Sequence, residues 1–276
     1  MIETLKVLAS HPWAAAAVAG VFGCCIGSFL NVCIWRMPRG ESVVFAPSHC
    51  PKCGMKIRFY DNIPILSYML LGGKCRGCRQ PISPRYWLVE LLTGVLAFGL
   101  YTLAVPVGGL APAAAIVWIA ALPLAVAGGF IDAEHGFIPD RLTVPAAVAG
   151  VALAAIFPAN WGFGAQQRVE AAVTSAGWML GTWAVLSLFA FAGKKIFRRE
   201  ALGGGDVKYV SAIAALCGIG ALFTLAAGSL AGSVYGCVSA LVRKDRLSAS
   251  TVRFAPWLGV GFLAWCLIRT FGRIGL

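Results

Sequence analysis

Two aspartates stand at the ends of long apolar runs, where a charged side chain is costly and its position is therefore informative. Asp132 closes the run that ends Gly128-Gly129-Phe130-Ile131, and Asp206 follows three glycines ahead of another apolar run. Two carboxylates in one site cannot both ionise easily, so one keeps a proton while the other is charged. Such a pair can hydrolyse a peptide bond, because the charged carboxylate activates a water and the protonated one polarises the carbonyl. Asp is also a good helix cap, and spacing alone favours that structural interpretation.

Four cysteines form two Cys-x-x-Cys pairs that 21 residues separate. The pairs are Cys50 with Cys53 and Cys75 with Cys78. This spacing predicts a four-thiolate zinc site, and two disulfides are the weaker alternative. A filled four-thiolate site has no open coordination position, so the zinc would be structural. Thiolates that bind metal must stay reduced, which predicts that this segment faces a reducing cytosol.

The composition is that of a membrane protein. Hydrophobic residues make up 59% of the 276 residues and charged residues only 12%, about half the charged fraction of a soluble domain. The formal net charge is +12, but the basic residues lie between apolar segments. That pattern favours membrane topology and contact with anionic membrane lipid over binding to nucleic acid.

Eight apolar segments are candidates for membrane-spanning helices. Of the 23 Lys and Arg residues, 19 fall in alternate loops on one side of these segments, which predicts that this side is cytosolic. Both aspartates then lie at the cytosolic boundary. The predicted spans cover residues 12–35, 86–105, 111–131, 142–158, 171–193, 207–219, 221–242 and 255–271.

The prediction is an all-α polytopic membrane protein with one polar insertion. We expect three parts: a first transmembrane segment over 1–35, a cytosolic zinc-binding domain over 36–85 and a membrane-embedded core over 86–276. Gly177 and Gly181 form a GxxxG motif in the fifth span. Their spacing favours tight helix packing within one bundle over a dimer contact.

Six motifs, three of which contain Asp132, Asp206 or Cys75, are spread over nearly the whole chain. They are Gly27-Ser28-Phe29-Leu30-Asn31-Val32 with Arg36-Met37-Pro38, Leu71-Gly72-Gly73-Lys74-Cys75, Arg85-Tyr86 with Glu90-Leu91, Asp132 followed by Pro139-Asp140, Gly203-Gly204-Gly205-Asp206-Val207-Lys208, and Arg253-Phe254-Ala255-Pro256. With this set the chain resembles the type IV prepilin peptidases, membrane aspartyl proteases of the GxGD type. The last motif departs from the family's P-F-G-P at two places.

The resemblance implies that Asp132 and Asp206 are the catalytic pair, with Asp140, Gly203, Gly205 and Lys208 in supporting roles. It also implies a second activity, methylation of the new N-terminal amine with S-adenosylmethionine, for which Gly73 and Lys74 are the candidate residues. Lys74 is also explained as one more cytosolic positive charge. The expected substrates are type IV prepilins or pseudopilins at the bacterial inner membrane. The alternatives are a prepilin peptidase without methyltransferase activity and a zinc-binding membrane transporter.

Overall fold

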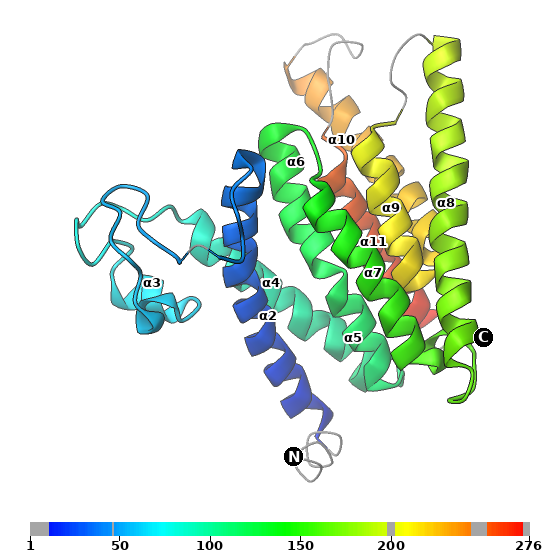
Figure 1. Cartoon of the computed structure of the whole chain (residues 1–276), viewed down its shortest axis with the longest axis horizontal. Coiled ribbons are helices and arrows are strands. Elements are labelled where there is room, and N and C mark those ends of the chain that lie inside the picture. Colours follow the sequence, from blue (N-terminus) through cyan, green and yellow to red (C-terminus); the bar gives the residue numbers. More distant parts are fainter. Residues whose placement is uncertain (1–10, 46, 198–201, 244–252, 273–276) are drawn as a thin grey trace. The chain divides into compact units, whose positions relative to one another are not determined.

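The computed structural model describes residues 11–45, 47–197, 202–243 and 253–272. The chain, drawn in Figure 1, divides into two compact units, Met1–Gly109 and Leu110–Leu276. The first ten residues of the predicted segment 1–35 lie outside the described residues. Six of the basic residues used to predict topology lie outside the described residues, at positions 6, 198, 199, 244, 246 and 273.

The first unit is built on two long helices, α2 (Pro12–Arg36) and α4 (Arg85–Thr102). Glycines let the two backbones approach closely: a Cβ on Gly23 would stand 2.6 Å from the Cβ of Ala97. Deeper along the same contact, the side-chain amide of Asn31 donates a hydrogen bond of 2.9 Å to the backbone carbonyl of Tyr86. Asn31 is 2% exposed, and this bond partly satisfies its buried amide.

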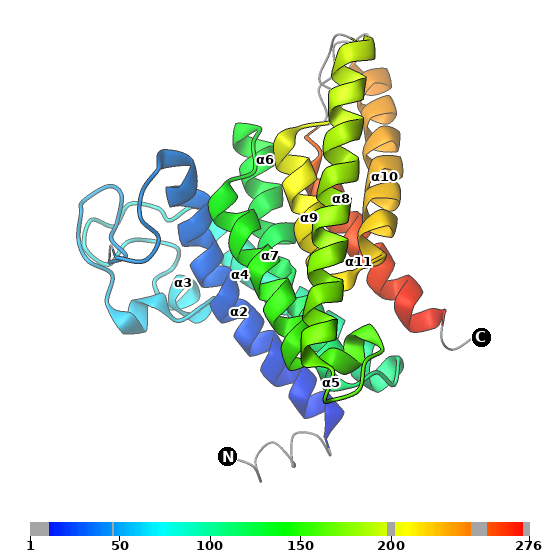
Figure 2. The ribbon, with the colours of Figure 1, turned by 45° about the vertical axis from the view of Figure 1, so that its right-hand side comes forward.

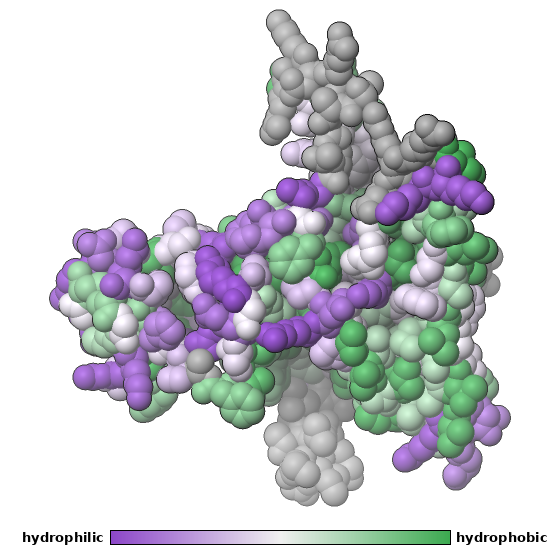
Figure 3. Space-filling model, turned by 45° about the horizontal axis from the view of Figure 1, so that its top comes forward, coloured by the Kyte–Doolittle hydropathy of each residue, from purple (hydrophilic) through white to green (hydrophobic). Residues whose placement is uncertain are grey.

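The segment between α2 and α4 contains only short helices: Met37–Arg39, Phe59–Asn62 and α3 (Leu66–Leu70). Hydrophilic side chains gather over this segment in Figure 3. Hydrogen bonds tie the segment to both long helices. The buried guanidinium of Arg36 donates to the carbonyls of Ser42 and Pro47, and the backbone N–H of Ile65 donates to the Glu90 carboxylate at 2.7 Å.

The second unit is a helical bundle around α9 (Gly204–Cys217). Nine residues of α9 are buried, because α7, α8, α10 and α11 all contact it (Figures 1 and 2). At Gly150 of α7 a Cβ would stand only 2.7 Å from the Cβ of Ala215, so these two helices also pack closely. The other helices of this unit are α5 (Pro112–Ala120), α6 (Gly129–His135), α7 (Asp140–Ile156), α8 (Arg168–Phe197), α10 (Gly220–Arg243) and α11 (Ala255–Phe271).

The all-helical prediction is confirmed, since the described residues form helices and two isolated bridges but no strand. Helices occur at all eight predicted spans. Within the described residues, five stretches are long and apolar enough to cross a membrane, namely Pro12–Arg39, Arg85–Val107, Pro112–His135, Arg168–Ile196 and Gly220–Val242, and Ala255–Phe271 is a shorter apolar helix. The chain is therefore a multi-pass membrane protein. The count of eight is approximate, because α7 and α9 fall outside these criteria.

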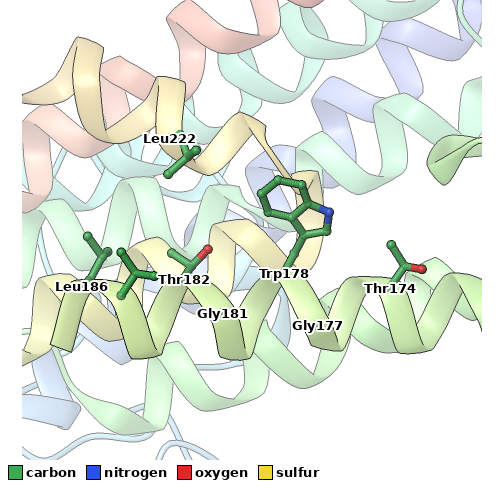
Figure 4. Close-up of a pocket in the computed structure, with 8 residues that line it drawn as sticks. Thr174, Gly177, Trp178, Gly181, Thr182, Leu186 and Leu222 are labelled. Atoms are coloured by element: carbon green, nitrogen blue, oxygen red, sulfur yellow. The ribbon is translucent and has the colours of Figure 1, made fainter. Parts of the chain in front are cut away.

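The interpretation of the GxxxG motif is wrong for the described residues. A Cβ on Gly177 or Gly181 would have no described atom within 4 Å, so no helix of the described bundle packs on this face. The two glycines instead line a groove of about 460 Å³ together with Trp178, Thr182 and Leu222, among others, and Figure 4 shows these side chains around it. Spacing identified a smooth helix face, but only the fold shows whether a neighbour covers it.

Candidate active site

Asp132 lies in α6, directly after a π-helical turn over Leu124–Gly128. Such turns occur often at functional sites because they redirect the side chains that follow them. The Asp132 side chain is 7% exposed. Its Oδ2 accepts a hydrogen bond of 2.9 Å from the backbone N–H of Ala255, at the start of α11. This bond from a distant part of the chain holds the carboxylate in place.

Asp206 is the third residue of α9, outside the five long apolar stretches and one residue ahead of the predicted sixth span. The pKa of its carboxyl is raised to about 6, first by burial and then by the negative charge of Asp132. The backbone N–H of Gly203 opposes the shift by hydrogen bonding to the carboxylate. This bond from the third helical residue back to the N-cap is half of a capping box. The charges of the two aspartates therefore interact within the second unit.

The three glycines before Asp206 have different surroundings. A Cβ on Gly203 would stand 3.0 Å from the carboxylate oxygen Oδ2 of Asp206, and one on Gly205 would stand 3.2 Å from the Cβ of Ile138. Gly204 has no described atom within 4 Å of such a Cβ. A side chain at the first or third glycine would thus press on a close neighbour, and one at the middle glycine would meet no described atom.

The predicted supporting residues also come together. The Lys208 ammonium lies 2.6 Å from a carboxylate oxygen of Asp140, which joins the first turn of α7 to α9 beside the aspartates. The two side chains are 44% and 62% exposed, so the ion pair positions the helices but contributes little stability.

Sequence reasoning missed three features of this site. The Ala255 backbone N–H lies in the motif that departs from the family pattern, and a backbone donor leaves no mark on side-chain identity. The Arg253 guanidinium lies against Gly136, a residue that stands between Asp132 and Asp140 in the sequence. Tyr209, one turn after Asp206, is fully buried, and its hydroxyl has no hydrogen-bond partner in the described part of the chain. The i to i+3 spacing from Asp206 was a signal for Tyr209, since it places both side chains on one helix face.

The four cysteines predicted to bind metal form one cluster in the first unit. Their sulfur atoms all lie within 4.8 Å of one another, and the Sγ atoms of Cys50 and Cys78 are 3.9 Å apart. Thiolates at about 2.3 Å from a tetrahedral zinc stand about 3.8 Å from each other, so the donor set fits this metal. Backbone N–H groups of Cys78 and Gly77 lower the pKa of Cys75 to about 7, which favours the thiolate that binds metal.

The two Cys-x-x-Cys turns have the same backbone pattern. In each, the N–H of the first cysteine donates to the carbonyl five residues later, in Met55 and Gln80 respectively. The residue after the second cysteine has a positive φ: 72° at Gly54 and 58° at Arg79. This repetition supports a metal knuckle, because both turns direct two sulfurs to the same side.

Gly73 and Lys74 immediately precede the second knuckle. Gly73 has a φ of 67°, and its N–H donates to the carbonyl of Tyr68 at 2.9 Å. The Lys74 side chain is exposed, while its backbone N–H donates to Leu71 within the same loop. The loop therefore presents the Lys74 ammonium to solvent and uses both backbone N–H groups internally.

Comparisons with known proteins agree over both units. Residues 21–104 match the bacterial peptidase A24 N-terminal domain, and residues 119–237 match the type IV leader peptidase family. The chain is 37% identical to the type 4 prepilin-like proteins leader peptide-processing enzyme of Escherichia coli over 94% of this chain and 96% of the relative. It is 31% identical to the prepilin leader peptidase/N-methyltransferase of Pseudomonas aeruginosa over 94% and 93%.

The protein of the same name from Myxococcus xanthus is 40% identical over 80% of this chain. The matched part spans 62% of that relative, less than two thirds of its length. No solved structure matches the chain.

Proposed function

Because the chain belongs to the type IV leader peptidase family, we propose that it cleaves the leader from type IV prepilins or pseudopilins and then methylates the new N-terminal amine. It is a membrane aspartic peptidase with N-methyltransferase activity. The observation that supports the cleavage step is the interaction between the charges of Asp132, in α6, and Asp206, at the start of α9.

The surroundings of the two carboxylates suggest different roles in cleavage. We assign the base that activates a water to Asp132, whose carboxylate the Ala255 N–H holds in place. Burial favours the protonated form of Asp206, so it polarises the scissile carbonyl and later protonates the leaving amine. With a pKa of about 6, roughly one Asp206 in ten holds its proton at pH 7.

We place the site at the cytosolic face of the bacterial inner membrane. The asymmetry of Lys and Arg between alternate loops supports this orientation. The apolar helix of a prepilin would then lie in the bilayer, with its short basic leader and the scissile bond at the boundary where the aspartates lie. The expected organisation follows: a first segment over 1–35, a zinc-binding domain over 36–85, a peptidase core over 86–276, contact with membrane lipid, and no nucleic acid partner.

For the methylation step, we propose that a structural zinc on Cys50, Cys53, Cys75 and Cys78 holds the loop that carries Gly73 and Lys74. The exposed Lys74 ammonium suits the carboxylate of S-adenosylmethionine. When bound, that cofactor supplies an electrophilic methyl group. The substrate's new α-amine has an ordinary pKa near 8, so a fraction of it is unprotonated and nucleophilic at cytosolic pH.

The cleavage proposal is tested with a synthetic prepilin and purified full-length protein, using mass spectrometry to detect loss of the leader. Asp132→Asn and Asp206→Asn are each expected to reduce cleavage by about 10³-fold or more, since each removes one half of the acid–base pair. Glu170→Gln, at an exposed position in the first turn of α8, is the control. Normal cleavage by either aspartate variant would rule out the pair.

Methylation is tested in the same assay with S-adenosylmethionine, as the gain of one methyl group on the cleaved product. Lys74→Ala is expected to lower methylation and to leave cleavage intact. Lys56→Ala is the matched control, because Lys56 is an exposed lysine beside the other cysteine knuckle. Equal methylation by the two variants would remove Lys74 from the site, and no methylation by the unmodified protein would favour the peptidase-only alternative.

A further inference from the structure

The second unit contains a cavity of about 470 Å³ at the end opposite the aspartates. It is lined by the start of α5, the turn after α7, the junction of α9 and α10, and the last turns of α11. Asp206 and Ala255 begin α9 and α11, whereas Cys217 and Arg269 lie near the ends of these helices. At 1.5 Å per residue, the cavity is on the order of 20 Å from the aspartates along the helix axes. It is therefore separate from the peptidase site.

Two side chains of this cavity, Arg269 and Asn160, bring hydrogen-bond donors. Arg269 brings a guanidinium, and the side-chain nitrogen Nδ2 of Asn160 is buried without a hydrogen-bond partner among the described residues. No Asp or Glu occurs among the described lining residues. A buried amide donor without a partner destabilises the folded protein, so a ligand that accepts its hydrogen bond is favoured. A cation beside an unpaired donor suits a phosphate oxygen.

The rest of the lining is aromatic and apolar. Four tryptophans contribute, and two of them, Trp118 and Trp265, are 4% and 8% exposed. Glycine makes room for a third: Gly218 has a φ of 55°, and a Cβ there would stand 3.0 Å from the Trp161 ring. Tryptophan and arginine together are typical of the membrane–water interface. Since the cavity lies on the order of 20 Å from the aspartates along the helix axes, it is displaced toward the side of the membrane opposite the predicted cytosolic boundary.

We propose that this cavity binds the anionic head group of a membrane phospholipid. The phosphodiester accepts hydrogen bonds from Arg269 and from the Asn160 amide, and the glycerol and upper acyl carbons pack against the tryptophans. Arginine matches a phosphate with two parallel N–H donors. Pockets of 300–1,000 Å³ with a few placed polar groups are typical small-ligand sites, and the cavity falls in this range.

The test uses full-length protein in detergent and native mass spectrometry with phosphatidylglycerol or phosphatidylcholine at graded concentrations. We expect tighter binding of phosphatidylglycerol by about fivefold or more. Arg269→Gln removes the cation and is expected to abolish this preference. Asn160→Asp replaces the unpaired donor with an acceptor of nearly equal size and is expected to do the same. Arg168→Gln is the matched control, because Arg168 is an exposed arginine that does not line the cavity.

Three outcomes would overturn the proposal: equal binding of the two lipids by the unmodified protein, an unchanged preference in both cavity variants, or loss of the preference in Arg168→Gln. A fourth concerns the source of the anion. If inorganic phosphate at millimolar concentration displaces phosphatidylglycerol, the cavity is a site for soluble anions and the lipid assignment fails. Cleavage of the synthetic prepilin by each variant serves as the check on folding.

Discussion

Replacing Asp206 by Asn should stabilise the protein at neutral pH while it removes cleavage. Burial and the charge of Asp132 raise the pKa of Asp206 from 3.8 to about 6. A carboxyl with a higher pKa in the folded than in the unfolded state opposes folding when it is ionised. This penalty is absent below about pH 4, grows between pH 4 and 6, and is fully present above pH 6.

The magnitude follows from the two pKa values. Each pKa unit is worth about 1.4 kcal/mol, so the ionised carboxylate destabilises the folded protein by about 3 kcal/mol at pH 8. Asparagine keeps the shape and never ionises. Asp206→Asn is therefore expected to raise the free energy of unfolding by about 3 kcal/mol at pH 8 and by less than about 1 kcal/mol at pH 4. For a chain of this size that corresponds to a melting temperature about 5–10 °C higher at pH 8.

The assay is thermal unfolding of purified protein in one detergent at pH 4, 6 and 8. Glu170→Gln is the control for removing one acidic charge, and it should change stability by only a few tenths of a kcal/mol. In an Asp132→Asn background the gain from Asp206→Asn should shrink, because one cause of the raised pKa is gone. An Asp206→Asn gain that is zero at pH 8, or equal at pH 4 and pH 8, would refute the reasoning.

Three more predictions concern the same residues and the cysteine cluster. Gly205→Ala should lower cleavage by about tenfold or more, because its Cβ would stand 3.2 Å from that of Ile138, whereas Gly204→Ala has open space and should cleave normally; equal losses would contradict the contact. Tyr209→Phe should raise the melting temperature at every pH, because a buried hydroxyl without a partner costs about 1–3 kcal/mol; a fall would indicate that the hydroxyl has a partner. Cys75→Ser should remove about one equivalent of zinc by metal analysis and damage methylation at least as much as cleavage; the opposite ranking would count against a zinc-held methylation loop.

Much of the candidate site could be predicted from sequence because its signals are local. The Cys-x-x-Cys turns each close within a few residues, so their spacing alone indicated a cluster that the fold then assembled from two turns. Asp132 and Asp206 stood out because carboxylates are rare and costly at the ends of apolar runs. The Asp140–Lys208 ion pair joins residues 68 positions apart, and only the family motifs suggested that both belonged to one site.

Other features depended on contacts that sequence does not encode locally. Three consecutive glycines look alike in the chain, yet a Cβ on Gly203 or Gly205 would meet Asp206 or Ile138, while one on Gly204 would meet no atom of the described residues. The GxxxG motif at Gly177 predicted a packed neighbour, but its face lines an open groove in the described bundle.

The sequence by itself determined that this chain forms membrane helices. A long apolar segment in lipid must satisfy its backbone hydrogen bonds internally, so its composition decides its local structure. Only the tertiary structure decided what differs between the two aspartates, because charge depends on surroundings that distant segments supply. The N–H of Ala255, 123 residues away, donates a hydrogen bond to Asp132, while burial in the bundle raises the pKa of Asp206.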